Sequence, residues 1–303
     1  MSSLTTTRSR LTYIIGAASL LVIIVVIVLL SYRFITGGSL GLRSFVSAKI
    51  YTVTNLPRAV LDRTNVQAHN QGDFTNIVFL HHSVGNNLIE QGEVREGLQE
   101  MGYDFWDHNY NHIGLRDPEG SFTGYSYNVP NDNTDPDGLA RIFNQRVYSL
   151  PVNTLSGLMQ HEVIALKSCF PTSDIIDQEQ LEQKKAWYLE MRAVMDQHPE
   201  KIFIILTQPP LNPASTTLEI AARASSLANW LTSAEFLNGH PNVFTYNFFH
   251  YLAESDPTAT DFDKLRQEYR QGTDSHPNQL ANETIGPLFI DFIRDSVQTY
   301  RNQ

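Results

Sequence analysis

Five short apolar runs recur in the chain after residue 73, and each is suited to a buried β-strand. They lie at Asn76–His81, Tyr103–Trp106, Val163–Lys167, Ile202–Thr207 and Val243–Phe248. The runs are continuously apolar instead of alternating, which is typical of parallel strands that are covered on both faces.

Helical periodicity lies between these runs, with apolar residues three or four positions apart. The first such stripe is Trp187, Met191, Val194 and Met195. The second is Ile220, Ala224, Leu227 and Leu231, and a last helix is predicted over about residues 280–297. Strands that alternate with helices predict a doubly wound α/β fold around a mainly parallel, five-stranded sheet.

A longer apolar stretch precedes this domain. Leu11–Tyr32 comprises 22 residues without a charged side chain, enough for a helix to cross a hydrocarbon core of about 30 Å. A cleaved signal peptide has a shorter apolar region, of about 7 to 15 residues, so the length favours an uncleaved anchor. The predicted organisation is a tail over residues 1–10, a transmembrane helix over 11–34, a stalk over 35–72 and a domain over 73–303.

Charge and cysteine content narrow the possible classes of protein. Arg8 and Arg10 in the short tail favour a cytoplasmic N-terminus, which predicts a single-pass membrane protein with its domain on the extracytoplasmic side. The formal net charge of −10 argues against nucleic acid as a partner, since a phosphate backbone requires a basic face. Cys169 is the only cysteine, so no intrachain disulfide can form.

The segment after the first predicted strand contains a candidate nucleophile. Ligands of open α/β sheets bind at the carboxyl ends of the strands, and Ser83 follows the first strand within His81–Asn87. At a strand-to-helix turn, the adjacent backbone N–H groups can stabilise an oxyanion, and Gly85 would permit a tight turn. The alternative interpretation is that Ser83 only caps the following helix.

A second polar segment, Gly272–Asn278, precedes the last predicted helix. Within it, His276 can act as a general base oriented by the carboxylate of Asp274. The alternative is a capping segment, in which Pro277 and Asn278 begin the helix. A serine early in the chain, with an acid and a histidine late, is one order compatible with nucleophilic catalysis.

Together these segments resemble the SGNH (GDSL-like) hydrolase superfamily over roughly residues 74–300. Phe79–Gly85 resembles the nucleophile block, Asp274–Asn278 the block that carries the acid and base, and Leu206–Leu211 a strand-end segment of the family. The resemblance implies a flavodoxin-like, doubly wound sheet of five strands. It also implies an esterase that needs no cofactor.

The resemblance assigns roles to individual residues. Ser83 would be the nucleophile, His276 the general base and Asp274 the group that orients it. The backbone N–H of Ser83 would be one oxyanion donor, with Gly114 and Asn86 as further candidates. The substrate would be an acyl or acetyl ester, of a carbohydrate or a lipid.

Three features depart from the family pattern. The nucleophile lies in His-His-Ser and not Gly-Asp-Ser, and Asp274 lies two residues before the histidine, where the family has three. Lys167–Pro171 lacks the asparagine expected after the third strand, so Ser168, a backbone group, Asn86 or Asn87 would take its place. The side chains expected to contact the substrate are His82, Asn87, Asn109 and Ser168.

Two other functions remain open from the sequence. The departures above are compatible with a binding protein that keeps the fold without catalysis. His81, His82, His108 and His112 are side chains of metal-ligating type, which would suit a metal-dependent hydrolase. The polar, aromatic segment Asp107–Pro151 is interpreted as a loop that wraps the ligand end of the sheet.

Overall fold

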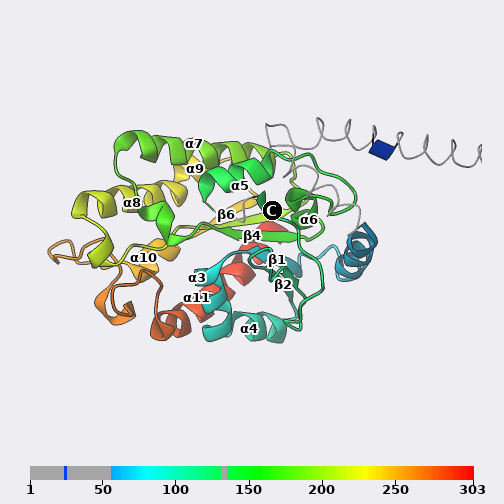
Figure 1. The fold of residues 1–303 in the computed structure, drawn as a ribbon, viewed down its shortest axis with the longest axis horizontal. Helices are drawn as coiled ribbons and strands as arrows, with labels where there is room; N and C mark the ends of the chain where they lie inside the picture. Colours follow the sequence, from blue (N-terminus) through cyan, green and yellow to red (C-terminus); the bar gives the residue numbers. More distant parts are fainter. Residues whose placement is uncertain (1–23, 26–55, 131–134) are drawn as a thin grey trace, which may run out of the picture. The chain divides into compact units, whose positions relative to one another are not determined.

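A six-stranded, mostly parallel sheet forms the centre of the structure, a computed structural model that describes residues 24–25, 56–130 and 135–303 (Figure 1). The strands are β1 Asn76–Leu80, β2 Asp104–His108, β3 Leu115–Arg116, β4 Val163–Lys167, β5 Ile202–Leu206 and β6 Val243–Tyr246. Their order is β3-β2-β1-β4-β5-β6, and only the β2–β3 pair is antiparallel. The predicted α/β fold with a mainly parallel sheet is therefore confirmed.

The prediction of five strands and one long loop after β2 was wrong in detail. β3 adds a sixth strand, with Asp107 opposite Arg116 and His108 opposite Leu115. Two residues are too few to give a hydrophobic pattern. The same segment also contains the helix α5 Pro136–Phe143, and it buries Tyr125 and Tyr127 in the core.

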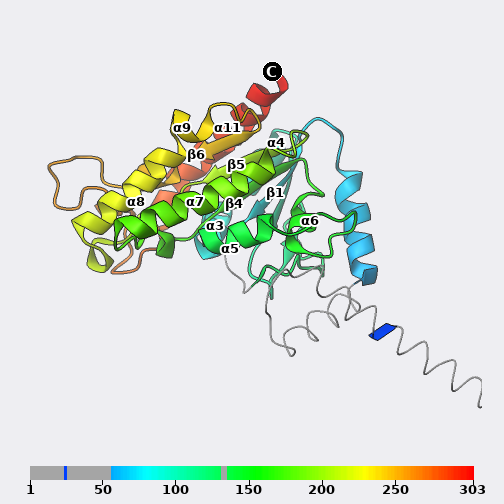
Figure 2. The same cartoon turned by 90° about the horizontal axis from the view of Figure 1, so that it is seen from above.

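Helices cover both faces of the sheet (Figures 1 and 2). One face packs against α5, α6 Thr154–Leu158, α7 Gln178–Met195, α8 Leu218–Leu231 and α9 Ala234–Leu237. The other packs against α3 Ser83–Gln91, α4 Val94–Glu100, α10 Phe248–Leu252 and α11 Gln279–Arg301. Short 3₁₀ turns complete the chain: η2 Phe170–Ser173, η3 Pro213–Ser215 and η4 Gln267–Tyr269.

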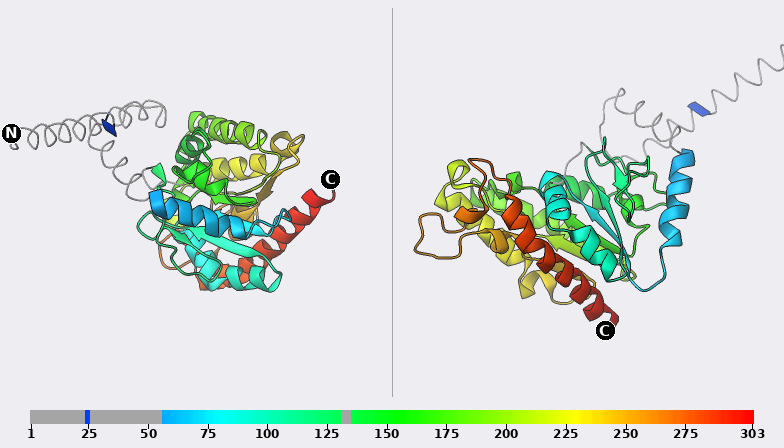
Figure 3. Two further views of the ribbon diagram at one scale, coloured as in Figure 1. Left: turned by 90° about the vertical axis from the view of Figure 1, so that its right-hand side faces the viewer. Right: turned by 90° about the horizontal axis from the view of Figure 1, so that it is seen from below.

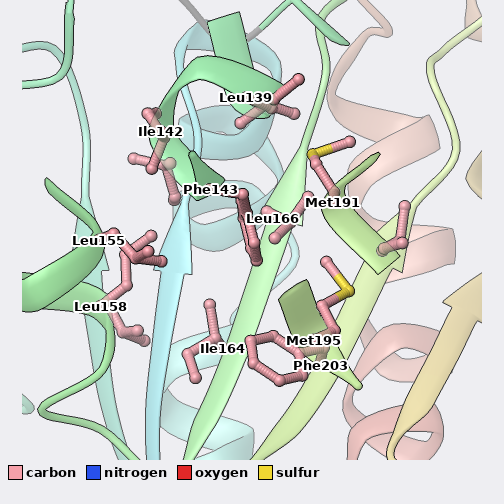
Figure 4. Packing of buried hydrophobic residues seen from close by; sticks show 14 of the residues in the cluster. Leu139, Ile142, Phe143, Leu155, Leu158, Ile164, Leu166, Met191, Met195 and Phe203 are labelled. Carbon is pink, nitrogen blue, oxygen red and sulfur yellow. The ribbon is translucent and has the colours of Figure 1, made fainter. Parts of the chain in front are cut away.

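The predicted helical stripes form buried faces. Met191 and Met195 of α7 lie over the sheet strands β4 and β5, beside side chains of α5 and α6 (Figure 4). Ala224, Leu227 and Leu231 of α8 are also buried. Each helix thus buries part of its predicted stripe, whose remaining members are only partly buried, and this burial favours packing of the layers.

The strand order has its topological switch point at β1. β1 pairs with β2 on one side and with β4 on the other, so the chain connections diverge in opposite directions from this point. In doubly wound sheets, ligands bind at such a switch point, outside the carboxyl ends of the strands. Ser83 follows β1 at this position.

A helix over residues 56–68 was not predicted. Ala59 and Val66 are buried in the core, and the carbonyl oxygen of Val66 accepts a hydrogen bond from Asn76 Nδ2 at 2.9 Å. Pro57–Gln303 form one compact unit, in which this helix is the blue one in Figure 3. Residues 57–72, expected in the stalk, are therefore part of the domain.

The predicted membrane anchor falls outside what can be described. Ile24 and Val25 are helical, but the remainder of the predicted span over residues 11–34 lies outside the described residues. Within the described part of the chain, no helix has both the length and the apolar composition needed to cross a membrane.

Candidate active site

Ser83 is the first residue of α3, directly after the end of β1. The N-cap is His82, whose extended backbone (φ −129°, ψ −151°) turns the chain from strand to helix without a side-chain capping bond. The alternative interpretation of Ser83 as the helix cap was therefore wrong. Its hydroxyl instead lies 2.8 Å from Nε2 of His276, a residue 193 positions later in the chain.

The histidine is held in turn by Asp274. Oδ1 of this carboxylate accepts hydrogen bonds from Nδ1 of His276 at 2.8 Å and from the His276 backbone N–H at 3.1 Å. The hydrogen bond from His276 is the main cause that holds the pKa of Asp274 below its usual range. A spacing of two residues is therefore sufficient for the carboxylate to reach the ring.

Both members of this pair are accessible to solvent. The side chain of Asp274 is 57% exposed and that of His276 is 27% exposed. Phe170, just after β4, packs edge-on against the His276 ring at a centroid distance of 4.9 Å. Ser83, His276 and Asp274 thus form a hydrogen-bonded chain at the carboxyl edge of the sheet, with an apolar wall on one side.

Asn212 supports the loop that carries the acid and base, and the sequence did not single it out. Its Nδ2 donates to the carbonyl oxygens of Gly272 and Asp274 at 3.1 and 3.0 Å. Its backbone N–H donates to Ser275 Oγ at 3.0 Å. Asn212 directly follows the strand-end segment Leu206–Leu211, so its position after a strand was the signal that could have found it.

The candidate oxyanion donors differ in whether their donor groups are already used in other hydrogen bonds. The Ser83 N–H lies in the first turn of α3, where helical N–H groups have no partner within the helix. The Gly114 N–H donates to the Tyr110 carbonyl at 2.7 Å, so it is already used within its own turn. Oδ1 of Asn86 accepts from Asn109 Nδ2 at 2.9 Å, and this bond does not engage the donor group of Asn86.

The four residues expected to contact the substrate also differ in burial and in their hydrogen bonds. Ser168 is fully buried and bonded to the Tyr188 hydroxyl at 3.1 Å, so its side chain points into the core and away from the site. Asn109 is buried and serves to hold Asn86. Asn87 is partly exposed on α3.

His82 directly precedes Ser83 and is part of an aromatic stack. Its ring lies on that of Tyr110 at 4.1 Å, with 17° between the ring planes. Burial lowers the pKa of His82 to about 4, with smaller contributions from the charges of His81 and Lys167. His82 is therefore neutral at physiological pH and forms a flat, mostly buried wall.

The histidines proposed as metal ligands do not converge. His81 contacts Asp107 at 3.0 Å, whereas Nε2 of His108 accepts from the Tyr127 backbone N–H at 3.1 Å. His82 and the exposed His112 stack on Tyr110. In the described ranges, no group of three or more His, Cys, Asp or Glu side chains is arranged to hold a metal ion.

No protein-family model and no curated protein matches this chain.

Proposed function

We propose that this protein is a serine ester hydrolase of the SGNH type, with Ser83 as its nucleophile. The observation that carries the proposal is the 2.8 Å contact between Ser83 Oγ and His276 Nε2, backed by Asp274 on the other ring nitrogen. This is the geometry of an activated nucleophile: a base within hydrogen-bond reach and a third group that orients the base.

Each residue has a defined task in the proposed reaction. His276 Nε2 takes the proton of Ser83 as Oγ attacks the ester carbonyl, and Asp274 stabilises the imidazolium that forms. The negative charge on the carbonyl oxygen develops near the N-terminus of α3, where the Ser83 N–H can bind it. His276 then protonates the leaving alcohol, and water releases the acyl group by the same route in reverse.

The fold supports the SGNH assignment. The five parallel strands run β2-β1-β4-β5-β6, which is the flavodoxin-like order of a doubly wound sheet, and Ser83 lies at its switch point. The substrate we propose is an acyl or acetyl ester of a carbohydrate or lipid. A membrane anchor over residues 11–34, with the domain on the extracytoplasmic side, would place this activity at the cell envelope.

The proposal is tested by hydrolysis of 4-nitrophenyl acetate with the full chain in detergent micelles. We expect activity that persists in a chelator and that is lost in Ser83→Ala and His276→Ala. Ser226→Ala is the matched control, because Ser226 is exposed on α8 and its hydroxyl donates to the Ala222 carbonyl within the same helix. Wild-type activity in Ser83→Ala would refute the proposal, and loss of activity in the chelator would favour a metal enzyme.

A further inference from the structure

A buried network of ionisable side chains lies behind Ser83, and the proposed reaction does not use it. His81 Nε2 lies 3.0 Å from Asp107 Oδ2, and Arg95 Nη2 donates to the other oxygen of the same carboxylate. The side chains of His81 and Asp107 are both 0% exposed. Removing a charged group from water costs several kcal/mol, so charges are rarely buried without a partner. The buried network therefore depends on these contacts among its members.

At its other end, the network contacts the His82–Ser83 peptide group. Nδ1 of His81 lies 2.9 Å from the carbonyl oxygen of His82, which also accepts the Asn86 N–H at 2.9 Å. A carbonyl oxygen can only accept, so His81 Nδ1 is the donor. Two donors thus converge on one carbonyl and fix the plane of the His82–Ser83 peptide.

The other ring nitrogen also faces an acceptor. Burial alone would raise the pKa of Asp107, but the hydrogen bond from His81 and the charges of His81 and Arg95 together lower it. Asp107 is therefore a carboxylate that accepts from His81 Nε2. The two ring nitrogens of His81 thus face two acceptors, the Asp107 carboxylate and the His82 carbonyl.

The geometry of the peptide carries this effect to the reaction centre. The His82 carbonyl and the Ser83 N–H belong to one planar peptide group, which is trans because the described chain contains no cis bond. A hydrogen bond to the oxygen orients the N–H on the opposite side and polarises it, since linked hydrogen bonds strengthen one another. The Ser83 N–H is the oxyanion donor of the proposed reaction.

The space for the His81 ring is provided by Gly85. A Cβ at Gly85 would lie 2.4 Å from His81 Cβ and 2.9 Å from His81 Nδ1. Phe79 packs against the ring from the strand, at a centroid distance of 5.0 Å. Gly85 has no positive φ, so it is needed for this close approach and not, as the sequence suggested, for a tight turn.

We propose that His81 is a positioning residue: held by Asp107 and Arg95, it fixes and polarises the Ser83 N–H as an oxyanion donor. The inference rests on the proposed esterase function. It adds to that function a second Asp–His pair, one that acts on the backbone of Ser83 and not on its hydroxyl.

Two substitutions separate the two ring contacts. The amide nitrogen of asparagine lies as many bonds from Cβ as Nδ1 does, so His81→Asn can keep the donor to the His82 carbonyl. The amide nitrogen of glutamine corresponds to Nε2, so His81→Gln keeps only the donor to Asp107. Both variants are neutral, and comparing them isolates the bond to the His82–Ser83 peptide.

His161 provides the matched control. It is equally buried and also bonded at both ring nitrogens, to Tyr127 Oη at 2.8 Å and Asn76 Oδ1 at 2.7 Å. It lies before β4, at the opposite end of the sheet from Ser83. Its Asn and Gln variants should lose stability without a change in kcat per folded molecule.

The experiment measures kcat and KM for 4-nitrophenyl acetate, together with Tm, in the full chain. We expect kcat of His81→Gln to be about tenfold below that of His81→Asn at equal KM, a smaller loss than the roughly 100-fold that follows direct removal of an oxyanion donor. Equal kcat values in the two variants, with activity that still depends on Ser83, would overturn the inference alone. Absence of Ser83-dependent hydrolysis in the wild type would overturn the proposed function and this inference with it.

Discussion

Two aspartate–histidine pairs are linked to Ser83, and they differ in burial and in task. His276 is partly exposed and bonds to the hydroxyl of Ser83, and its partner Asp274 is more than half exposed. His81 and Asp107 are fully buried, and His81 bonds to the carbonyl oxygen of the His82–Ser83 peptide. An exposed pair can exchange protons with solvent at little cost, but a buried pair keeps its charges fixed. The same residue types thus suit proton transfer in one place and a fixed electrostatic field in the other.

Among the substitutions that test this comparison, removal of the His276 side chain should have the largest effect on activity. His276→Ala should lower kcat for ester hydrolysis by about 10⁴-fold or more, as for other bases of serine hydrolases. Because the side chain is partly exposed and packs against Phe170, which is itself only partly buried, Tm should stay close to that of the wild type. A fall in kcat that is matched by a fall in the folded fraction would contradict a chemical role.

Substitution of Asp107 should instead lower the stability of the fold strongly. Asp107→Ala leaves Arg95 and His81 buried without their shared carboxylate, which should cost about 3–5 kcal/mol of unfolding free energy. Asp274→Ala is the matched control, with an expected cost below about 1 kcal/mol because that carboxylate is more than half exposed. Urea unfolding of both variants, followed by tryptophan fluorescence, measures the difference. Similar losses in the two would mean that burial does not distinguish the pairs.

A second buried carboxylate, that of Asp62, shows what partners contribute to a buried charge. Asp62, on the helix over residues 56–68, has no hydrogen-bond partner for either oxygen among the described residues, and burial raises its pKa to about 7. Asp107, with His81 and Arg95 beside it, has its pKa lowered instead. The two aspartates are similarly buried, so the difference lies in the paired charges.

This contrast predicts a pH dependence. Asp62 ionises at about pH 4 in the unfolded chain and at about pH 7 in the folded one, so the folded state binds more protons between these values. The stability that the protonated carboxyl contributes is complete below pH 4 and is lost as the pH rises through 7. At 1.36 kcal/mol per pKa unit, the loss is up to about 4 kcal/mol.

Asp62→Asn tests this pH dependence directly, since an amide does not ionise. The variant should gain stability relative to the wild type as the pH rises from 4 to 8. Denaturant unfolding at four or five pH values measures the slope. Parallel stability curves for the two proteins would show that Asp62 does not titrate in the folded state.

The sequence predicted the regions with a strong local pattern. The continuously apolar parallel strands and the stripes of α7 and α8 were predicted because burial on both faces or on one stripe leaves a direct trace. The helix over residues 56–68 was missed because its buried face consists of Ala59, Asp62 and Val66, which form no apolar stripe. The two-residue β3 was missed because its pairing depends on its neighbour β2 and not on its own residues.

The same division holds within the site. Ser83, His276 and Asp274 were predicted because each follows a strand or precedes a helix in a recognisable order. The pairing of His81 with Asp107 was not predicted, because it arises from strand register: Phe79 lies opposite Asp107, which places the aspartate beside the end of β1. Register depends on the packed sheet, and a single sequence does not display it. Ser168 was misjudged for the same reason, since only the packed sheet shows that its side chain faces Tyr188.

The smallest expected effect comes from Gly85, and it tests the buried pair without removing any charge. Gly85→Ala places a methyl group 2.4 Å from His81 Cβ, so the ring must shift away from the His82 carbonyl. Overpacking of this kind costs about 1–3 kcal/mol, and the shift should lower kcat more than it raises KM.

Gly97→Ala in α4 is the matched control: its Cβ would meet only the end of the flexible Ile290 side chain. That alanine should be neutral or slightly stabilising, since alanine favours a helix over glycine by about 1 kcal/mol. If Gly85→Ala unfolds at the same denaturant concentration as Gly97→Ala and keeps full kcat, the His81 ring tolerates displacement, and the buried pair serves the stability of the fold alone.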